Sequence, residues 1–246
     1  MSDSGTHYNP SISVDCVVFG FDSKNLKILL IDQNSSSSGN SKLKLPGSLV
    51  LKNRDLDEYT GLVLMELTGL DNVFLRQLYT FGSAGRVSRK QDREWIESTY
   101  SVSIRRIVST AYYSLIKIDH SNEELMERSH NARWYDVSSI KTLAFDHYII
   151  MQKGLEVLRQ ELRFNPIIGF ELLPEKFSLR NVQNIYEAIT GNKYDNRNFR
   201  KKLGQAKYLI PLNEKQKGVA HKPAVLYRFD KEKYFNTRKE INLFYI

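Results

Sequence analysis

The chain has 246 residues, of which 41% are hydrophobic and 26% are charged, a composition typical of a water-soluble globular protein of one or two domains. Its longest apolar runs are only strand-length, which excludes a membrane-spanning helix, and the polar residues 1–10 predict no signal peptide. We therefore expect a cytoplasmic protein. The lone Cys16 lies within an apolar run and is expected to be a buried strand residue.

The net charge of +8 is distributed unevenly along the chain. Residues 1–164 contain 20 of the 36 Lys and Arg residues and 20 of the 28 Asp and Glu residues, so 16 basic and only 8 acidic residues follow from Asn165 onward. A neutral part followed by a basic part indicates that the basic part binds a polyanion. On charge alone, a solvated basic surface without a partner explains the pattern equally well.

The first part of the chain predicts a sheet with few helices. Strands are expected at residues 11–21, 26–32, 73–81, 99–103, 108–118 and 134–136. Residues 44–51 are expected to form a short strand and turn. A helix is predicted from the N-cap Asp55 to Thr68, with a capping box completed by Glu58 and a stop at Gly69. The serine-rich residues 34–41 predict a loop, and residues 86–97 a long, charged, exposed segment.

The second part predicts a different layout. A helix is expected over residues 146–163, and Asn165-Pro166 should end it. Two short helices follow, capped by Ser178 and Asp195, and then two strands at residues 208–212 and 224–229 around a basic loop. Helix, short connection, helix and β-hairpin is the order of a winged helix. We therefore predict an N-terminal domain at residues 1–160 and a winged helix-turn-helix domain at residues 165–246.

Between Leu45-Pro-Gly-Ser48 and Glu66-Leu-Thr-Gly-Leu70 the chain resembles the Nudix box, whose carboxylates hold Mg²⁺ against a pyrophosphate in hydrolases. Most of those carboxylates are missing. The substituted positions carry Ser48 for the first glycine, Arg54 for the first glutamate, Leu62 and Val63 for the arginine–glutamate pair, and Leu67 for the last glutamate. Only Glu66 remains, and one carboxylate cannot assemble the metal site. We therefore predict no enzymatic activity, no metal and no cofactor.

Further fragments of the chain resemble the Nudix-related transcription regulators. They include Gln77-Leu-Tyr-Thr-Phe-Gly82, Ser109-Thr-Ala-Tyr-Tyr113, Leu143-Ala-Phe-Asp-His147, Phe170-Glu-Leu-Leu-Pro174, Asn198-Phe-Arg-Lys-Lys-Leu203 and Lys222-Pro-Ala-Val-Leu-Tyr-Arg-Phe229. Their joint order makes the resemblance specific. It implies an α+β protein, in which a Nudix-like α/β/α sandwich with a mixed sheet precedes a C-terminal winged helix-turn-helix domain. It also implies a homodimer that binds double-stranded operator DNA.

Regulators of this family sense either ADP-ribose, in the control of NAD metabolism, or a pentose, as in the arabinose-utilisation repressor of AraR type. The missing carboxylates and the inserted residues 86–97 favour the arabinose type. We therefore expect a repressor of sugar utilisation that L-arabinose releases from DNA. The alternatives are an ADP-ribose-sensing regulator, a Nudix hydrolase with a nucleic-acid-binding appendage, and a nucleic-acid-binding module whose first domain only dimerises.

The predicted site residues fall into two groups. For the effector pocket we expect Lys44, Glu66, Phe81, Gly82, Arg86 and Tyr100. For DNA we expect Arg180, Asn181, Asn184, Asn196, Arg197, Asn198, Arg200, Lys201, Lys202, Lys215, Lys217, His221 and Lys222. In the predicted wing the family's G-R-P-A is replaced by His221-Lys222-Pro223-Ala224, so a lysine takes the place of the arginine fork. The histidines at 120, 130 and 147 lack metal-ligand spacing, and His147 is expected to be structural.

Overall fold

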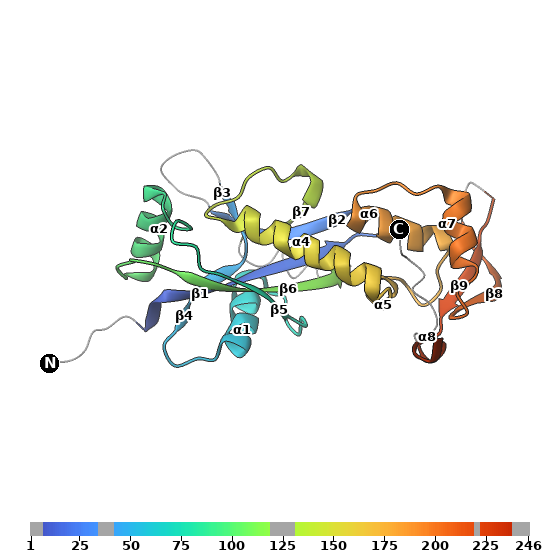
Figure 1. Ribbon diagram of the computed structural model, residues 1–246, viewed down its shortest axis with the longest axis horizontal. Coiled ribbons are helices and arrows are strands. Elements are labelled where there is room, and N and C mark those ends of the chain that lie inside the picture. Colours follow the sequence, from blue (N-terminus) through green and yellow to red (C-terminus); the bar gives the residue numbers. More distant parts are fainter. Residues whose placement is uncertain (1–6, 34–41, 119–130, 219–221, 238–246) are drawn as a thin grey trace. The chain divides into compact units, whose positions relative to one another are not determined.

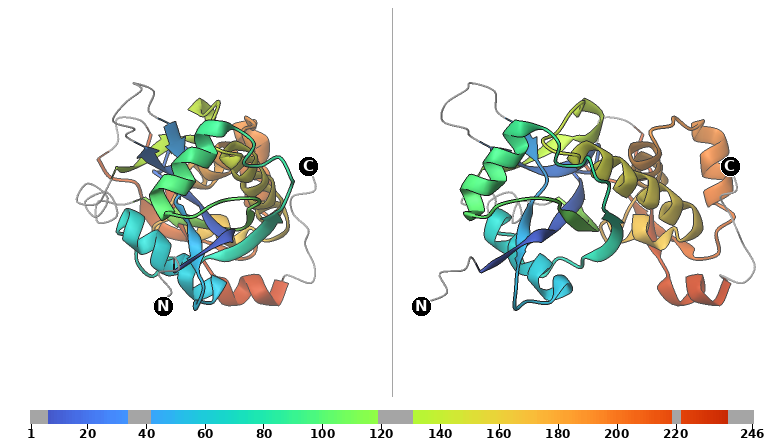
Figure 2. Two further views of the ribbon diagram at one scale, coloured as in Figure 1. Left: turned by 90° about the vertical axis from the view of Figure 1, so that its left-hand side faces the viewer. Right: turned by 60° about the vertical axis from the view of Figure 1, so that its left-hand side comes forward.

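The computed structural model describes residues 7–33, 42–118, 131–218 and 222–237 (Figures 1 and 2). It forms two compact units. The first comprises residues 1–20 and 27–155, and the second comprises residues 21–26 and 156–246. In the described part of the chain, no helix combines the length and the apolar character needed to cross a bilayer.

The first unit is built on a seven-stranded sheet. Its strands are β1 (Tyr8–Phe21), β2 (Leu26–Gln33), β3 (Lys42–Lys44), β4 (Gly47–Leu51), β5 (Arg76–Phe81), β6 (Val108–Lys117) and β7 (Ala132–Asp136). Five of them run in the order β3-β2-β1-β6-β5, while β4 pairs with β1 and β7 pairs with β2. Each predicted strand region therefore contains a strand, apart from residues 99–103.

The side chains of β1 alternate between the two faces of the sheet, and a helix packs against each face. Val14, Cys16 and Val18 belong to the core clusters that include the buried side of α1 (Leu56–Thr68). Val17 and Phe19 point the other way and lie close to Gly154 in α4 (His147–Phe164). Figure 1 shows α1 and α4 on opposite sides of the strands. The division between the two compact units falls inside α4, between residues 155 and 156.

Three local predictions in this unit are wrong. Asp55 occupies the N-cap position of α1, but its side chain makes no capping hydrogen bond, and Glu58 instead pairs with Arg54 at 3.3 Å. Residues 86–97 are not a uniformly exposed segment, and residues 99–103 are not a strand. They contain α2 (Lys90–Tyr100), in which Ile96 is buried against Leu49. The charged composition predicted an exposed segment, but the hydrophobic contact of Ile96 buries one side of the helix.

The second unit has the layout predicted for a winged helix. It contains α5 (Ile167–Phe170), α6 (Leu179–Thr190), α7 (Asn196–Leu203), the hairpin β8 (Leu209–Lys215) and β9 (Val225–Phe229), and α8 (Lys231–Thr237). Ser178 caps α6 in a capping box and Asp195 caps α7, both as predicted. A β-bridge between Phe177 and Tyr227 extends the hairpin at one point. The sequence analysis did not predict this bridge or α8.

Candidate ligand pocket and DNA-binding surface

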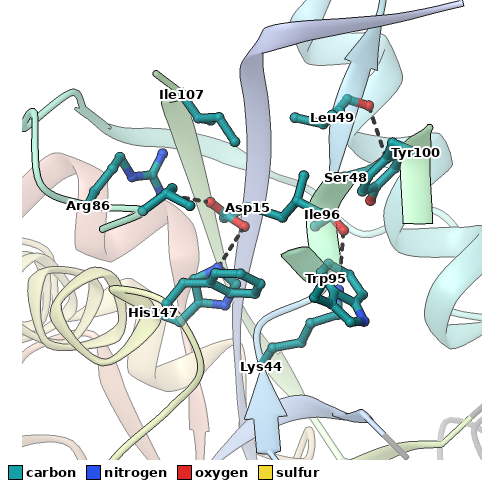
Figure 3. Close-up of a pocket in the computed structure, with 13 residues that line it drawn as sticks. Asp15, Lys44, Ser48, Leu49, Arg86, Trp95, Ile96, Tyr100, Ile107 and His147 are labelled. Carbon is teal, nitrogen blue, oxygen red and sulfur yellow. Dashed lines mark hydrogen bonds and ion pairs between the residues drawn. The ribbon is translucent and has the colours of Figure 1, made fainter. Parts of the chain in front are cut away.

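The first unit contains a pocket that opens to solvent (Figure 3). Its walls come from β1, β3, β4, α2 and the start of α4. The polar lining side chains are Asp15, Lys44, Ser48, Arg86 and His147, and the aromatic ones are Trp95, Tyr100 and Phe145. The pocket is therefore a concave site in which several charged groups face aromatic rings, a combination that suits a small polar ligand.

Asp15 is the central acceptor on the pocket floor. The alternation of β1 places it on the opposite face from Val14 and Cys16, where it is 4% exposed. The Ser109 hydroxyl donates a hydrogen bond to its Oδ2 atom. Its Oδ1 lies 3.3 Å from Nε2 of His147, and its Oδ2 lies 3.7 Å from Nη2 of Arg86. The carboxylate thus organises three side chains from three different segments.

His147 is held as a neutral ring. Its Nδ1 accepts a hydrogen bond of 2.9 Å from the backbone N–H of Leu45, so its proton sits on Nε2 and points to Asp15. Burial lowers the pKa of His147, and the nearby Asp15 opposes that shift only in part. Within the described residues there is no group of His, Cys, Asp and Glu side chains suited to a metal ion. His147 therefore joins Asp15 to the backbone of Leu45, and its expected structural role stays a prediction.

Arg86 is an ion-paired cation of the pocket that keeps one nitrogen without a hydrogen-bond partner among the described residues. Its Nε and Nη2 atoms donate to the two carboxylate oxygens of Asp146 at 3.0 and 2.9 Å. The side chain is 4% exposed, and its buried Nη1 has no hydrogen-bond partner in the part of the chain that the structure describes. A buried guanidinium N–H without an acceptor is costly. An oxygen-rich ligand in the pocket would supply the missing acceptor.

Lys44 is a second buried cation. Its Nζ lies 3.4 Å from the carbonyl oxygen of Gly47 and 5.3 Å from the centre of the Trp95 ring. Burial lowers the pKa of Lys44 from 10.5 to about 8, although Asp15 acts in the opposite direction. The ammonium is therefore mostly charged at neutral pH, but it can lose its proton under mildly basic conditions.

An aromatic wall completes the pocket. The ring centres of Trp95 and Phe145 are 5.7 Å apart, and those of Trp95 and Tyr100 are 6.3 Å apart. Phe145 lies 5.0 Å from the His147 ring. Flat π-surfaces of this kind bind planar heterocycles by stacking. Because cations and rings lie in one cavity, the pocket can hold a ligand that joins an anionic group to a planar one.

Three of the six residues predicted for the effector line this pocket, namely Lys44, Arg86 and Tyr100. The other three are not among its lining residues. Glu66 is exposed on α1, Phe81 packs against Tyr79, and the carbonyl of Gly82 accepts a hydrogen bond from Arg106. The sequence analysis missed Asp15, Trp95, Phe145 and His147 as pocket residues. A usable signal existed for Asp15, the one charged residue of the apolar run from Val14 to Phe21.

The second unit presents the predicted basic surface on α7. Phe199 and Leu203 are buried, as their spacing of four predicts, while Asn196, Arg197, Asn198, Arg200, Lys201 and Lys202 are exposed. Arg180 on α6 is exposed and donates to Oδ1 of Asn196 at 2.7 Å. In the hairpin, Lys215, Lys217 and Lys222 are exposed, and His221 lies outside the described residues. Most of the predicted cations are thus on the surface.

Asn181 and Asn184 are placed differently from the helix-surface cations. The Asn181 carboxamide oxygen accepts hydrogen bonds from the Ser178 backbone N–H at 2.9 Å and from its hydroxyl at 2.6 Å. This side chain is therefore engaged in capping α6. Asn184 is half-buried. Of the three residues of α6 that were predicted to bind DNA, Arg180 is the one whose side chain contacts α7, through its hydrogen bond to Asn196.

The turn between α6 and α7 is fixed by a buried carboxylate. Glu187 accepts hydrogen bonds from Gln183 at 2.8 Å and from the backbone N–H of Tyr194 at 3.2 Å, and it pairs with Lys193 at 3.1 Å. Burial alone would raise the pKa of Glu187, but these hydrogen bonds and Lys193 lower it below its ordinary value. The network holds the segment that leads into α7 and so sets where the basic helix starts.

Comparison with known proteins supports both halves of this description. Residues 169–229 match the family model described as the NrtR DNA-binding winged helix domain. Over 234 residues the chain is 28% identical to a protein of Acinetobacter baylyi named ADPR responsive transcriptional repressor NtrR, covering 92% of this chain and 84% of that protein.

Two solved structures resemble the whole chain. Shewanella oneidensis NrtR in complex with a 27mer DNA has a TM-score of 0.63 and 24% identity, covering 90% of this chain and 94% of that one. A MutT/nudix family protein from Enterococcus faecalis has a TM-score of 0.60 and 19% identity, covering 92% and 88%. The predicted fold, a Nudix-like domain followed by a winged helix domain, is confirmed.

The expected effector is contradicted by the same comparisons. We expected a sugar-utilisation repressor that responds to L-arabinose, whereas the curated relative that spans nearly the whole chain is named for its response to ADP-ribose. The two features that favoured arabinose do not discriminate. The missing carboxylates concern metal binding, and the inserted residues 86–97 include part of α2, which supplies Trp95 to the pocket.

Proposed function

We propose that the protein is a transcriptional repressor that binds DNA through its winged helix domain and binds ADP-ribose in the pocket of its first unit. The observation that carries the proposal is the buried Nη1 of Arg86, which lacks an acceptor within the described residues of an aromatic-walled pocket. The name of the Acinetobacter baylyi relative identifies ADP-ribose as an effector of such a repressor.

The pocket offers complementary groups for the parts of ADP-ribose. A diphosphate carries several oxygen acceptors, and the guanidinium of Arg86 with the ammonium of Lys44 would bind them as charge-assisted donors. The Trp95, Tyr100 and Phe145 rings would stack against adenine. A free pentose has neither the negative charge nor the planar base, so it would offer no charged acceptor to the Nη1 atom of Arg86 and no ring to the aromatic wall.

The winged helix would bind operator DNA with α7 in the major groove. Arg197, Arg200 and the two lysines that follow lie on its exposed side, where guanidinium groups can reach guanine edges and ammonium groups can reach phosphates. The Arg180–Asn196 hydrogen bond supports this arrangement, because it orders an amide at the start of the helix. We expect two copies of the chain to bind the two half-sites of a pseudo-palindromic operator.

The proposal is tested by calorimetric titration of the full-length protein with ADP-ribose, with AMP, ribose 5-phosphate, NAD and L-arabinose as comparisons. Fluorescence anisotropy then measures binding to a duplex isolated by selection from a random-sequence library, with and without ADP-ribose. We expect ADP-ribose to bind most tightly and to weaken DNA binding. ADP-ribose that fails to bind, or that binds and leaves the DNA affinity unchanged, would contradict the proposal.

Matched variants locate the two sites. Arg86→Gln should weaken ADP-ribose binding about tenfold or more, since a charge-assisted hydrogen bond contributes roughly 1.5–3 kcal/mol. Glu66→Gln, on the exposed face of α1, should leave it unchanged. Arg197→Ala should weaken DNA binding and reduce its salt dependence. Lys141→Ala, which removes an exposed cation of the first unit, should change neither the DNA affinity nor its salt dependence.

A further inference from the structure

The helix that begins at the ligand pocket belongs to both compact units. Asp146 immediately precedes α4, and His147, its first residue, lines the pocket. The helix continues without interruption to Phe164, while the division between the units falls between residues 155 and 156. The residues of one helix are therefore divided between the unit that contains the pocket and the winged-helix unit.

The start of α4 is held by polar contacts to the pocket walls. Arg86 pairs with both carboxylate oxygens of Asp146, and His147 accepts the hydrogen bond from the Leu45 N–H. Just upstream, the Phe145 carbonyl accepts from Nη2 of Arg89 at 2.8 Å. These contacts come from the segment before α2 and from the chain between β3 and β4. The position of the first turn therefore depends on the same segments that enclose the ligand.

The backbone of Phe145, just before α4, adopts an unfavourable conformation. Its φ is 55°, in the left-handed region that is unfavourable for a bulky side chain. The residue also lines the pocket, and its ring packs against Trp95 and His147. Loss of the contacts that hold the segment would let Phe145 relax and would change both the aromatic wall and the direction in which α4 starts.

Arg86 is the group that the ligand and α4 would share. It already binds Asp146 and lies 3.7 Å from Asp15, so two carboxylates surround one guanidinium. A third anion placed on its Nη1 would repel both carboxylates across a guanidinium that is only 4% exposed. Of the two, Asp15 is fixed further by Ser109 and His147, whereas Arg86 is the partner that the structure gives the Asp146 side chain. Asp146 is therefore the carboxylate that would yield.

We propose that the Arg86–Asp146 ion pair is the switch that couples pocket occupancy to α4. The inference rests on the proposed ADP-ribose function. In the ligand-free state the pair fixes the first turn of α4. An anionic ligand that takes Arg86 as its partner weakens the pair and releases that turn. Because coupling is reciprocal, the contact that stabilises the ligand-free state must also oppose ligand binding.

The test uses Asp146→Asn in the full-length protein, which keeps the side-chain size and removes the charge. We expect it to bind ADP-ribose more tightly than the wild type and to bind the selected duplex more weakly without ligand. In the wild type we expect ADP-ribose to weaken DNA binding about fivefold or more, as is typical of allosteric coupling. In the variant this factor should fall towards one. Asp136→Asn, which removes an ion pair to Lys27 outside the pocket, should preserve the wild-type factor.

A measurement on the wild type keeps the test independent of how well the variant folds. The backbone N–H groups of Ile149 and Ile150 both donate to the Asp146 carbonyl, at 2.9 and 3.2 Å. Hydrogen exchange at these two amides should become faster when ADP-ribose binds. Unchanged or slower exchange would overturn the switch, and so would an Asp146→Asn variant that retains the wild-type coupling factor.

Different results contradict the proposed repressor function and the proposed Arg86–Asp146 switch. If ADP-ribose does not bind the wild type or does not affect its DNA binding, the proposed function itself is wrong. If both effects are present in the wild type and persist in Asp146→Asn, the repressor function stands and only the coupling through Arg86 and Asp146 is wrong.

Discussion

The pH dependence of ligand binding follows from the burial of Lys44. Its ammonium lies in the pocket with a pKa of about 8, so raising the pH removes the positive charge that a diphosphate would bind. The protonated fraction falls from about 0.9 at pH 7 to about 0.1 at pH 9, which predicts a rise of up to about tenfold in the Kd for ADP-ribose. An exposed lysine with an ordinary pKa would give almost no change in this range.

The other groups facing Lys44 do not produce the same change. His147 accepts a hydrogen bond from the Leu45 N–H and its pKa is lowered by burial, and burial raises the pKa of Cys16 far above this range. The diphosphate of ADP-ribose has no group that titrates between neutral pH and about pH 9.

Calorimetric titration at a series of pH values is the assay, with Lys44→Arg as the variant that stays charged throughout. The Kd of the variant should not change with pH. A wild-type Kd that is constant to about pH 9, or a variant with the same pH dependence as the wild type, would refute the role of the Lys44 charge.

Three further predictions concern stability. Gly47→Ala should unfold at a lower temperature than the wild type, because its Cβ would lie 2.6 Å from the Val14 carbonyl oxygen, while Gly82→Ala, with only ordinary contacts, is the control for thermal unfolding. Asp195→Ala should lose about 1 kcal/mol in urea unfolding, since its side chain caps α7; an unchanged midpoint would show that the cap contributes nothing. Glu187 has a lowered pKa, so its stabilisation is present above the unfolded-state pKa and is lost as the pH falls through the folded-state value. Unfolding of Glu187→Gln followed against pH should lack that acid-dependent loss, and a variant with the wild-type pH profile would contradict it.

The elements best predicted from the sequence are those fixed by local patterns. The alternation of β1 predicted which side chains share a face, and Gly69 ends α1 in a left-handed conformation at φ 73°, as a glycine stop requires. Ser178 and Asp195 cap their helices because each side chain reaches a backbone N–H three residues away. These features depend on neighbours in the chain, so one sequence contains the information for them.

The pocket depends on contacts between distant segments and was only partly predicted. Asp15, Arg86 and His147 meet although they are separated by more than 60 residues each, and no local periodicity relates them. The charged stretch around α2 predicted exposure, yet Asp92 is 3% exposed because it pairs with Arg89, whose charge compensates its burial. Composition alone does not distinguish a carboxylate buried beside a half-exposed arginine from two solvated charges.

The choice of effector shows the same limit. From residue types, Lys44, Arg86 and Tyr100 could bind either a sugar through its hydroxyls or a nucleotide through its phosphates and base. What separates the two ligands physically is the hydrogen-bond acceptor and the planar ring that each can offer to the pocket. Asp146 occupies only one side of the Arg86 guanidinium, and its Nη1 has no acceptor among the described residues. A diphosphate offers charged oxygen acceptors to this Nη1 and adenine offers a ring to the aromatic wall, whereas a neutral pentose offers only hydroxyls, so the folded pocket favours the nucleotide.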